Sequence, residues 1–310
     1  MCKRALLLLA HGTPDVPDEV PEYLRYVTGG RPLPPHVVEE ITDRYRQVGG
    51  SPLTGITRAL AERVQKALGE ETKVYFAMRN WHPFIGDVMG QMRADGVTEA
   101  AVICLAPQNS RTSVGLYKRA VEAESAGMRI DFTPEWHSHP ILIQAFAENL
   151  RKAWHKLSQE AGQKIPVLFT AHSVPERTLQ ATEQAPADNY ADQARETAQL
   201  VAEKLPELEE WEFAFQSQGQ SGGAWIGPRV EEKLQTMADA GCTILMLDPI
   251  GFLADHVEIL FDIDIDFRQK AKDLGMRLER PESLNDSELL ARALCELAQI
   301  AFARLENTKP

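Results

Sequence analysis

The chain of 310 residues carries 45 acidic and 33 basic side chains, which gives a formal net charge of −12 and an isoelectric point near 5.2. An acidic surface repels phosphates, so the composition argues against a protein that binds nucleic acid or anionic lipid. With 44% hydrophobic and 25% charged residues, the chain is typical of globular proteins, and its length predicts two domains of about 150 residues.

Short apolar runs alternate with amphipathic stretches along the chain. The first run, 5–10, follows Lys3 and Arg4, but it is too short for a signal peptide and no cleavage site follows it. No stretch approaches the ~20 apolar residues of a membrane helix, so we expect no membrane segment. The predicted strands are 5–10, 73–78, 100–106, 129–133, 166–171, 211–215 and 243–248, and the predicted helices are 54–69, 84–95, 115–126, 140–159, 191–204, 228–240, 255–273 and 286–306. This alternation predicts an α/β fold with parallel sheets covered on both faces.

An internal repeat predicts two similar halves. Residues 6–14 (LLLLAHGTP) match residues 167–175 (VLFTAHSVP) at an offset of 172 − 11 = 161 residues. MRADG at 92–96 and MADAG at 237–241 form a second pair, and each ends at a glycine of the kind that caps helices. We therefore expect an N-terminal half over 1–158 and a C-terminal half over 159–285, with the last helix, 286–310, packed back on the first half.

Each half places a histidine at the carboxyl end of its first strand, His11 in one and His172 in the other. Ligands of open α/β sheets bind beyond the carboxyl ends of the strands. If the two halves face each other, both imidazoles point into one cleft. A single histidine at such a position is more often structural, but its repetition favours a functional role, above all for His172.

Several well-known motifs are absent from the sequence. No GxGxxG follows a strand, and neither GxxxxGK[ST] nor GxSxG occurs, which argues against nucleotide-binding enzymes and nucleophile-elbow hydrolases. The four cysteines (Cys2, Cys104, Cys242 and Cys295) form no CxxC pair, so we expect neither a zinc ribbon nor an iron–sulfur cluster. Scattered cysteines are typical of a reducing compartment, and we expect the protein in the cytoplasm.

The segment 247–267 (LDPIGFLADHVEILFDIDIDF) concentrates acidic residues in one predicted helix. Glu258, Asp262 and Asp266 recur at i, i+4 and i+8, one stripe of an α-helix, and no lysine or arginine precedes Arg268. Like charges at this spacing repel each other, and a cation held by their oxygens would relieve the repulsion. The pattern predicts a site that handles a metal ion; the alternative is an acidic helix start favoured by the helix dipole.

Around His172 and Glu258 the motifs AHSVPE and GFLADHVEILFDID resemble the two signature motifs of the ferrochelatase family. The resemblance continues through HGTPD at 11–15, DRYRQVGGSPLTGIT at 43–57, MRNWHPFIGD at 78–87, LAPQNSRTSVGLYKR at 105–119, WHSHPILIQAF at 136–146 and FQSQGQ…AWIGP at 215–228. It implies two Rossmann-like halves of the class II chelatase type without a nucleotide fingerprint. It also implies a porphyrin in the cleft between the halves and the insertion of ferrous iron in haem biosynthesis.

The resemblance assigns His172 and Glu258 to the site of metal insertion. A free-base porphyrin loses two pyrrole protons as the metal enters, and histidine is a usual acceptor near neutral pH. On this basis His172 either accepts a proton or ligates the incoming iron. Asp262 and Asp266 would continue a path for cations or released protons, and Asp255 and His256 would hold the start of the helix in place.

The porphyrin's carboxylates require cationic or hydroxyl partners. The resemblance indicates Arg31, Arg44, Arg46, Ser51 and Tyr117 for this role. Apolar wall residues are expected from Leu24, Tyr26, Trp225, Ile250 and Phe252. His11 stands where related bacterial members commonly have tyrosine; opposite His172 across the ring, its imidazole could ligate iron in the product.

Segment 20–35 (VPEYLRYVTGGRPLPP) is expected at the mouth of the cleft, and it is short and polar. Together with the short chain and the lack of a C-terminal cysteine cluster, this favours coproporphyrin III as substrate and coproheme as product. Protoporphyrin IX, giving protohaem, is the alternative. Two other functions stay open: insertion of cobalt or nickel into another tetrapyrrole, and a haem or tetrapyrrole carrier without turnover. Iron is then a substrate, no permanently bound cofactor is expected, and we expect a monomer.

Overall fold

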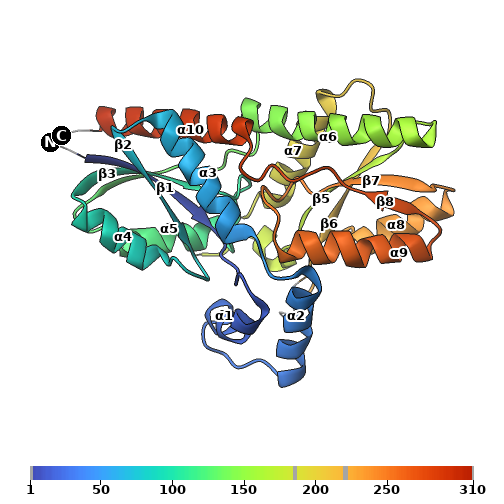
Figure 1. Cartoon of the computed structure of the whole chain (residues 1–310), viewed down its shortest axis with the longest axis horizontal. Helices are drawn as coiled ribbons and strands as arrows, with labels where there is room; N and C mark the ends of the chain where they lie inside the picture. Colours follow the sequence, from blue (N-terminus) through green and yellow to red (C-terminus); the bar gives the residue numbers. More distant parts are fainter. Residues whose placement is uncertain (1–2, 184–186, 219–222, 309–310) are drawn as a thin grey trace.

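The computed structural model describes residues 3–183, 187–218 and 223–308, so Cys2 and residues 219–222 of the motif at 215–228 lie outside the described residues. Within these ranges the chain forms two four-stranded parallel sheets that lie side by side, each flanked by helices (Figure 1). The first sheet has the order β2-β1-β3-β4 and the second the order β6-β5-β7-β8. The strands are β1 (Lys3–Ala10), β2 (Thr72–Met78), β3 (Val97–Cys104), β4 (Arg129–Phe132), β5 (Val167–His172), β6 (Trp211–Gln216), β7 (Ile244–Asp248) and β8 (Arg277–Glu279). The predicted α/β class with parallel sheets is confirmed.

The two sheets share one strand order. In each half the first strand lies between the second and the third, and the fourth strand follows at the far edge. Both first strands are apolar and buried, as in Leu6–Leu9 of β1 and Val167–Phe169 of β5. The carboxyl ends of β1 and β5 are therefore equivalent positions in two equivalent sheets, as the internal repeat predicts.

The helices cover both faces of the sheets. They are α1 (Val20–Val27), α2 (Pro35–Val48), α3 (Leu53–Leu68), α4 (Ile85–Ala94), α5 (Val114–Ala123), α6 (Pro140–Ala161), α7 (Tyr190–Glu203), α8 (Val230–Asp239), α9 (Arg268–Asp273) and α10 (Glu288–Asn307), with short 3-10 turns at Pro17–Glu19 and Glu176–Leu179. The sequence did not predict α1, α2 or the three-residue strand β8. Both α1 and α2 carry proline in their first turn, where the missing N–H has no intrahelical partner in any case and a helix tolerates it.

One predicted helix has a different geometry. The segment predicted as an α-helix over 255–273 begins as a π-helix, η3 (Glu258–Phe267), and only then continues as α9. A π-helix is wider because its hydrogen bonds join residues i and i+5. One turn of such a helix takes slightly more than four residues, so the spacing i, i+4, i+8 still places Glu258, Asp262 and Asp266 along one side of it.

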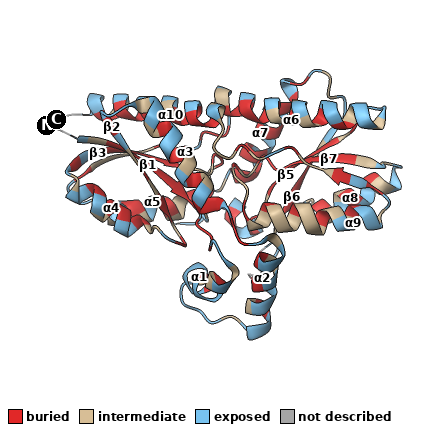
Figure 2. Cartoon of the chain, viewed as in Figure 1, coloured by how far each residue is buried: buried red, intermediate tan, exposed pale blue. Residues whose placement is uncertain are grey.

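The two halves share one apolar core. Its largest cluster joins Leu6 and Leu8 of β1 to Phe169 of β5 through residues of α6 and α10. Helix α10 packs against α3, α6, β3 and β4, so the end of the chain returns to the N-terminal half (Figure 2). The predicted boundary at 158/159 lies near the carboxyl end of α6. Because interiors are close-packed, this shared core fixes how the two sheets face each other.

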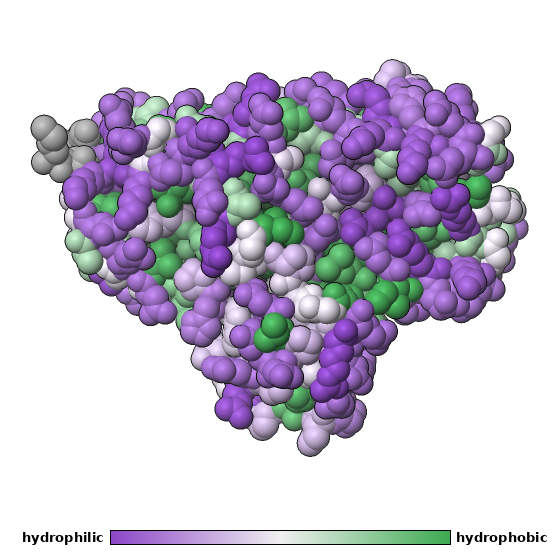
Figure 3. All heavy atoms as spheres, viewed as in Figure 1, coloured by the Kyte–Doolittle hydropathy of each residue, from purple (hydrophilic) through white to green (hydrophobic). Residues whose placement is uncertain are grey.

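Helices α1 and α2, with the turn between them, project from the sheets as a lip, residues 20–48 (Figure 1). The lip has a small core of its own, in which Val20, Tyr23 and Leu24 of α1 pack against Tyr45 of α2 and Trp81. The visible face of the molecule is mostly hydrophilic, with hydrophobic side chains gathered where the lip meets the C-terminal half (Figure 3). In the part of the chain that the structure describes, no helix is both long and apolar enough to span a membrane.

Asp248, the last residue of β7, is 3% exposed, and its Oδ2 atom has no hydrogen-bond partner among the described residues. Burial raises its pKa to about 8, although the nearby Arg280 acts in the opposite direction. The folded state therefore keeps a proton on Asp248 at neutral pH, whereas the unfolded chain loses it near its ordinary value of about 4.

We predict that the free energy of unfolding of Asp248→Asn exceeds that of the wild type by a margin that grows as the pH rises. Between about pH 4 and about pH 8 only the unfolded wild type ionises this group, so wild-type stability should fall by up to about 1.4 kcal/mol per pH unit relative to the variant. Urea unfolding followed by tryptophan fluorescence measures the difference. Asp239→Asn, on the exposed end of α8, is the matched control; a stability difference for Asp248→Asn that did not change with pH would contradict the prediction.

Candidate functional site

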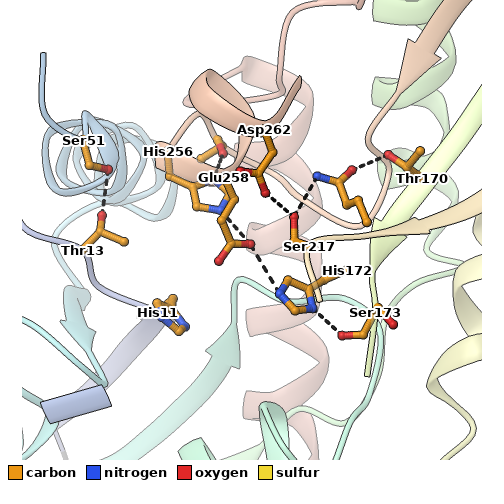
Figure 4. Close-up of polar contacts among 12 residues, drawn as sticks. His11, Thr13, Ser51, Thr170, His172, Ser173, Ser217, His256, Glu258 and Asp262 are labelled. Atoms are coloured by element: carbon orange, nitrogen blue, oxygen red, sulfur yellow. Dashed lines mark hydrogen bonds and ion pairs between the residues drawn. The ribbon is translucent and has the colours of Figure 1, made fainter. Parts of the chain in front are cut away.

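His172 ends β5, and the segment that follows β7 packs directly against it. Gly251 is essential to this contact, because a Cβ atom at this position would lie 2.7 Å from both Cα and Cβ of Ala171 and 3.4 Å from the His172 amide nitrogen. The ring of His172 is oriented by a contact between its Nδ1 atom and the Ser173 carbonyl oxygen. The Tyr190 hydroxyl donates a hydrogen bond to the His172 carbonyl at 2.9 Å. The remaining ring nitrogen, Nε2, is directed towards Glu258 (Figure 4).

Glu258 is the first residue of the π-helix, and its carboxylate lies beside two imidazoles. Its Oε2 atom is 3.6 Å from His172 Nε2 and 3.9 Å from His256 Nε2. Burial by itself would raise the pKa of this carboxyl, but the neighbouring His172, His256 and His11 and the guanidinium of Arg44 hold it below its usual range. The carboxylate therefore stays ionised at neutral pH.

His11 comes from the opposite half, just after β1, and faces the His172–Glu258 pair (Figure 4). Its ring borders the space between the halves but lies deep in the molecule, where surrounding protein removes it from bulk water. The loss of hydration disfavours the charged imidazolium and lowers the pKa of His11 to about 4, although the charge of Glu258 acts in the opposite direction. Its Nε2 atom lies 3.1 Å from the Tyr23 hydroxyl and 3.1 Å from the Asn80 amide nitrogen. His11 is thus a neutral imidazole at pH 7.

All three residues line one cavity of about 540 Å³ between the halves. The N-terminal half contributes residues that follow β1, β2 and β3 and residues of α3 and α5, while the C-terminal half contributes residues that follow β5 and β7. A volume of this size is typical of sites that bury a drug-sized ligand. The apolar lining includes Leu53, Ile56, Leu60, Leu105, Val174, Trp225, Phe252, Leu253 and Leu290.

The two acidic residues that follow Glu258 at i+4 and i+8, Asp262 and Asp266, have different partners, and neither lines the cavity. Asp262 accepts a hydrogen bond from the Ser217 hydroxyl at 2.5 Å and lies 3.8 Å from Arg44 of the lip. Burial and the charge of Glu258 raise its pKa to about 6, against the effects of Ser217 and Arg44. Asp266 instead pairs with Lys270 at 2.7 Å. Part of the negative charge is therefore balanced by protein cations from the lip and α9, and the handling of a metal ion by these residues stays a prediction.

No group of three or more His, Cys, Asp or Glu side chains in the described ranges is arranged to hold a metal ion. Asp255 and His256 lie where the sequence predicts support for the helix start. Asp255 contacts Arg280, Ser283 and Asn285. The Nδ1 atom of His256 lies 3.0 Å from the Ala254 carbonyl oxygen, and burial lowers the pKa of His256, while Glu258 opposes this effect.

The structure brings only part of the predicted porphyrin-binding set to the cavity. Tyr117, Trp225, Phe252 and His11 line it. Leu24 is buried inside the lip, Ser51 accepts a hydrogen bond from Thr13, and Arg46 pairs with Glu39 and Asp43 on an exposed face of α2. Arg31 is exposed and donates to the Thr28 carbonyl, and Arg44 lies 3.8 Å from Asp262. The ring of Tyr26 meets the Trp81 ring edge-on and the Phe84 ring at a tilt, and Ile250 is fully buried. Seven predicted residues are therefore absent from the cavity lining: Leu24, Tyr26, Arg31, Arg44, Arg46, Ser51 and Ile250.

Two arginines that the sequence did not single out line the cavity instead. Arg79 directly follows β2, and its guanidinium lies 5.8 Å from the centre of the Tyr117 ring. Arg177 follows β5 and is exposed at the cavity on the C-terminal half. The hydroxyls of Ser110, Thr112 and Ser113 lie in the same lining. Arg79 directly follows the predicted strand 73–78. Because ligands of such sheets bind beyond the carboxyl ends of the strands, this position could have identified Arg79 from the sequence.

Comparison with known proteins assigns the family. The ferrochelatase family model matches residues 3–301. The chain belongs to the ferrochelatase family. It is 53% identical to the ferrochelatase of Acidobacterium capsulatum over 99% of this chain and 97% of that protein. It is 33% identical to the coproporphyrin III ferrochelatase of Geobacillus thermodenitrificans over 97% of this chain and 95% of that protein.

The fold is also that of the class II chelatases. The sirohydrochlorin chelatase SirB from Bacillus subtilis subspecies spizizenii, solved with cobalt, superposes with a TM-score of 0.58 at 11% identity, covering 99% of this chain and 98% of that chain. At this identity the likeness concerns the fold alone. The activity of the ferrochelatase family is metal insertion into a porphyrin, and the protein is a lyase of this type.

We predict that His11→Ala changes the absorption spectrum of the metallated porphyrin complex. A neutral imidazole on this wall can ligate the product iron, since hydrogen bonds to Tyr23 and Asn80 contribute only about 1 kcal/mol each. The Soret band of the wild-type complex should therefore differ from that of the variant, while Tyr23→Phe should leave the wild-type band in place. Superimposable spectra of wild type and His11→Ala would rule out axial ligation.

Proposed function

We propose that the protein inserts ferrous iron into coproporphyrin III to give coproheme, with His172 and Glu258 as the pair that acts on the pyrrole protons. The observation that carries the assignment is the 3.6 Å separation of His172 Nε2 and Glu258 Oε2 on the wall of a cavity between two halves. An acid–base pair at this distance, open to a ligand-sized space, is suited to proton transfer.

The electrostatics support a division of roles between the two residues. Free-base porphyrin releases two protons for each Fe²⁺ that enters. His172 accepts the two protons one after the other at Nε2, and Glu258, which stays ionised because its pKa is held low, stabilises the imidazolium each time it forms. Asp262, with a pKa of about 6, accepts a proton more readily than Glu258, whose pKa is lowered, and so receives each proton that leaves His172. Asp266, already paired with Lys270, has a lesser part in this path than the sequence alone suggested.

We predict that His172→Ala and Glu258→Gln each lower kcat for metal insertion by about 10²- to 10⁴-fold, the range of a general base. Porphyrin affinity should change little, because the cavity keeps its apolar walls. The assay mixes protein, porphyrin and ferrous iron or zinc without oxygen, and follows the four-band free-base spectrum as it collapses to two bands. Retention of wild-type kcat in either variant would remove that residue from the mechanism.

The same assay tests the carrier alternative. A carrier binds porphyrin and quenches its fluorescence, but the four-band spectrum persists in the presence of metal. Replacing iron with cobalt or nickel, and porphyrin with sirohydrochlorin, tests the remaining alternative chelatase activity.

Two features support coproporphyrin III over protoporphyrin IX. Coproporphyrin III carries four propionates, and the cavity presents cations from both halves, Arg79 from the N-terminal half and Arg177 from the C-terminal half, with Ser110, Thr112 and Ser113 in the same lining. Guanidinium groups are strong partners for carboxylates. Relatives such as the Geobacillus thermodenitrificans protein are named for coproporphyrin III. Protoporphyrin IX, with two propionates, would leave one side of this arrangement unused.

We predict that kcat/KM is higher for coproporphyrin III than for protoporphyrin IX, and that Arg177→Gln lowers it for coproporphyrin III by about tenfold, the effect of losing one charge-assisted hydrogen bond. Arg119→Gln, an exposed position on α5 outside the cavity lining, is the matched control. Higher kcat/KM with protoporphyrin IX, and no change in Arg177→Gln, would favour the protohaem-forming alternative.

We also infer a cytoplasmic monomer. The described cysteines, Cys104, Cys242 and Cys295, are all free thiols, which is usual in a reducing compartment. Burial raises the pKa of the Cys104 thiol, which makes this group inert. Ferrous iron and the porphyrin are the substrates in this proposal, and the expectation that no cofactor is permanently bound stays a prediction.

A further inference from the structure

The segment between β8 and α10, residues 280–287, contacts the chain on both sides of Glu258. Arg280 donates from Nε to Asp264 Oδ1 at 2.9 Å and from Nη2 to Asp264 Oδ2 at 2.8 Å. The same Nη2 atom lies 3.1 Å from Asp255 Oδ1. The Arg280 side chain is only 10% exposed. One nearly buried guanidinium therefore joins two carboxylates that flank Glu258 in sequence.

Asp255 is held by further contacts from the same segment. The Ser283 hydroxyl donates to Asp255 Oδ1 at 2.7 Å, and the Asn285 amide nitrogen donates to Oδ2 at 3.1 Å. The Asn285 side-chain oxygen in turn accepts from the Asp255 backbone nitrogen at 2.8 Å. Both carboxylate oxygens of Asp255 thus have partners, and the approach to the π-helix is fixed in place.

The spacing of these contacts brackets the proposed catalytic carboxylate. Asp255 precedes Glu258 by three residues and Asp264 follows it by six. Helices of the π type are rare and mostly limited to a single turn, so a π-helix over Glu258–Phe267 needs contacts from outside to keep its shape. Arg280 supplies such a contact on both sides of the residue whose position matters most.

We propose that Arg280 is a positioning residue, which sets the place of the Glu258 carboxylate relative to His172 by joining Asp255 to Asp264 across the start of the π-helix. The inference rests on the proposed role of Glu258. Arg280 is not in the lining of the cavity that holds Glu258, so it acts through the helix and not on the porphyrin. Misplacing a catalytic group by about 1 Å can lower a rate about 100-fold.

A second, smaller cavity makes a selective test available. It has a volume of about 360 Å³ and lies among α6, β7 and β8, where Lys152, Lys156, Met246, Arg277 and Arg280 are among its lining residues. In Arg280→Ala, this cavity gives a small guanidinium compound access to the vacated position. Ethylguanidine, below denaturing concentrations, is the probe.

The experiment measures kcat and KM for zinc and iron insertion, together with porphyrin affinity by fluorescence quenching. We expect Arg280→Ala to lower kcat about 100-fold, to leave KM and affinity for the porphyrin unchanged, and to regain activity in ethylguanidine. Arg280→Lys keeps the charge but lacks the planar fork that pairs with Asp264 through two nitrogens and reaches Asp255 as well, so it should also have a low kcat, without rescue.

Arg268→Gln is the matched control, because Arg268 lies 3.5 Å from the same Asp264 but has a side chain that is 41% exposed, against 10% for Arg280. This variant should retain the wild-type kcat, and ethylguanidine should not change that kcat. Wild-type kcat in Arg280→Ala or Arg280→Lys overturns the proposal, and so does loss of porphyrin binding together with kcat, which indicates a general structural role. If Arg280→Ala does not fold, Arg280→Lys decides. Failure of the wild type to insert metal would instead refute the proposed function.

Discussion

The contact between Gly251 and the end of β5 is the constraint on which the site depends. His172 belongs to one strand and Glu258 to a helix that starts after another strand, so their separation depends on how closely the two segments approach. With any larger residue at 251, a Cβ atom would lie 2.7 Å from Ala171, a distance at which the backbones must move apart. The 3.6 Å separation of His172 and Glu258 is therefore a consequence of backbone packing.

A second constraint fixes the opposite wall. His11 reaches the same cavity from the other half, and its position depends on the shared core in which β1 and β5 are joined through α6 and α10. Since α10 is the last helix of the chain and packs on α3, β3 and β4, the end of the sequence stabilises the face-to-face arrangement. The cavity is thus a property of the whole chain and belongs to neither half alone.

The charges around Glu258 are arranged in two groups with different effects. On the cavity side, imidazoles keep its pKa low, which favours an ionised carboxylate beside a base. On the other side, Arg280 pairs with both Asp255 and Asp264, and Arg268 adds a second positive charge beside Asp264, so the two carboxylates support the helix with a cation for each. Asp262 belongs to neither group: it contacts Ser217 and Arg44, and its pKa is raised to about 6.

The sequence alone determined the α/β class, the two-fold repeat and the positions of His11, His172 and Glu258, because apolar strands, their alternation with amphipathic helices and repeated motifs are local patterns. It did not determine the lip helices, whose prolines resemble loop signals, or the π-helix, whose hydrogen bonding has no compositional signature.

Which arginines face the cavity was decided only by tertiary structure. Arg46 and Arg79 are equally cationic in the sequence, but Arg46 pairs with Glu39 on an exposed face and Arg79 lines the cavity. Arg280 lies 22 residues from Glu258 in the chain (280 − 258 = 22), and only the return of β8 beside the π-helix brings its guanidinium to Asp264, because an ion pair between distant segments depends on packing that no local pattern encodes.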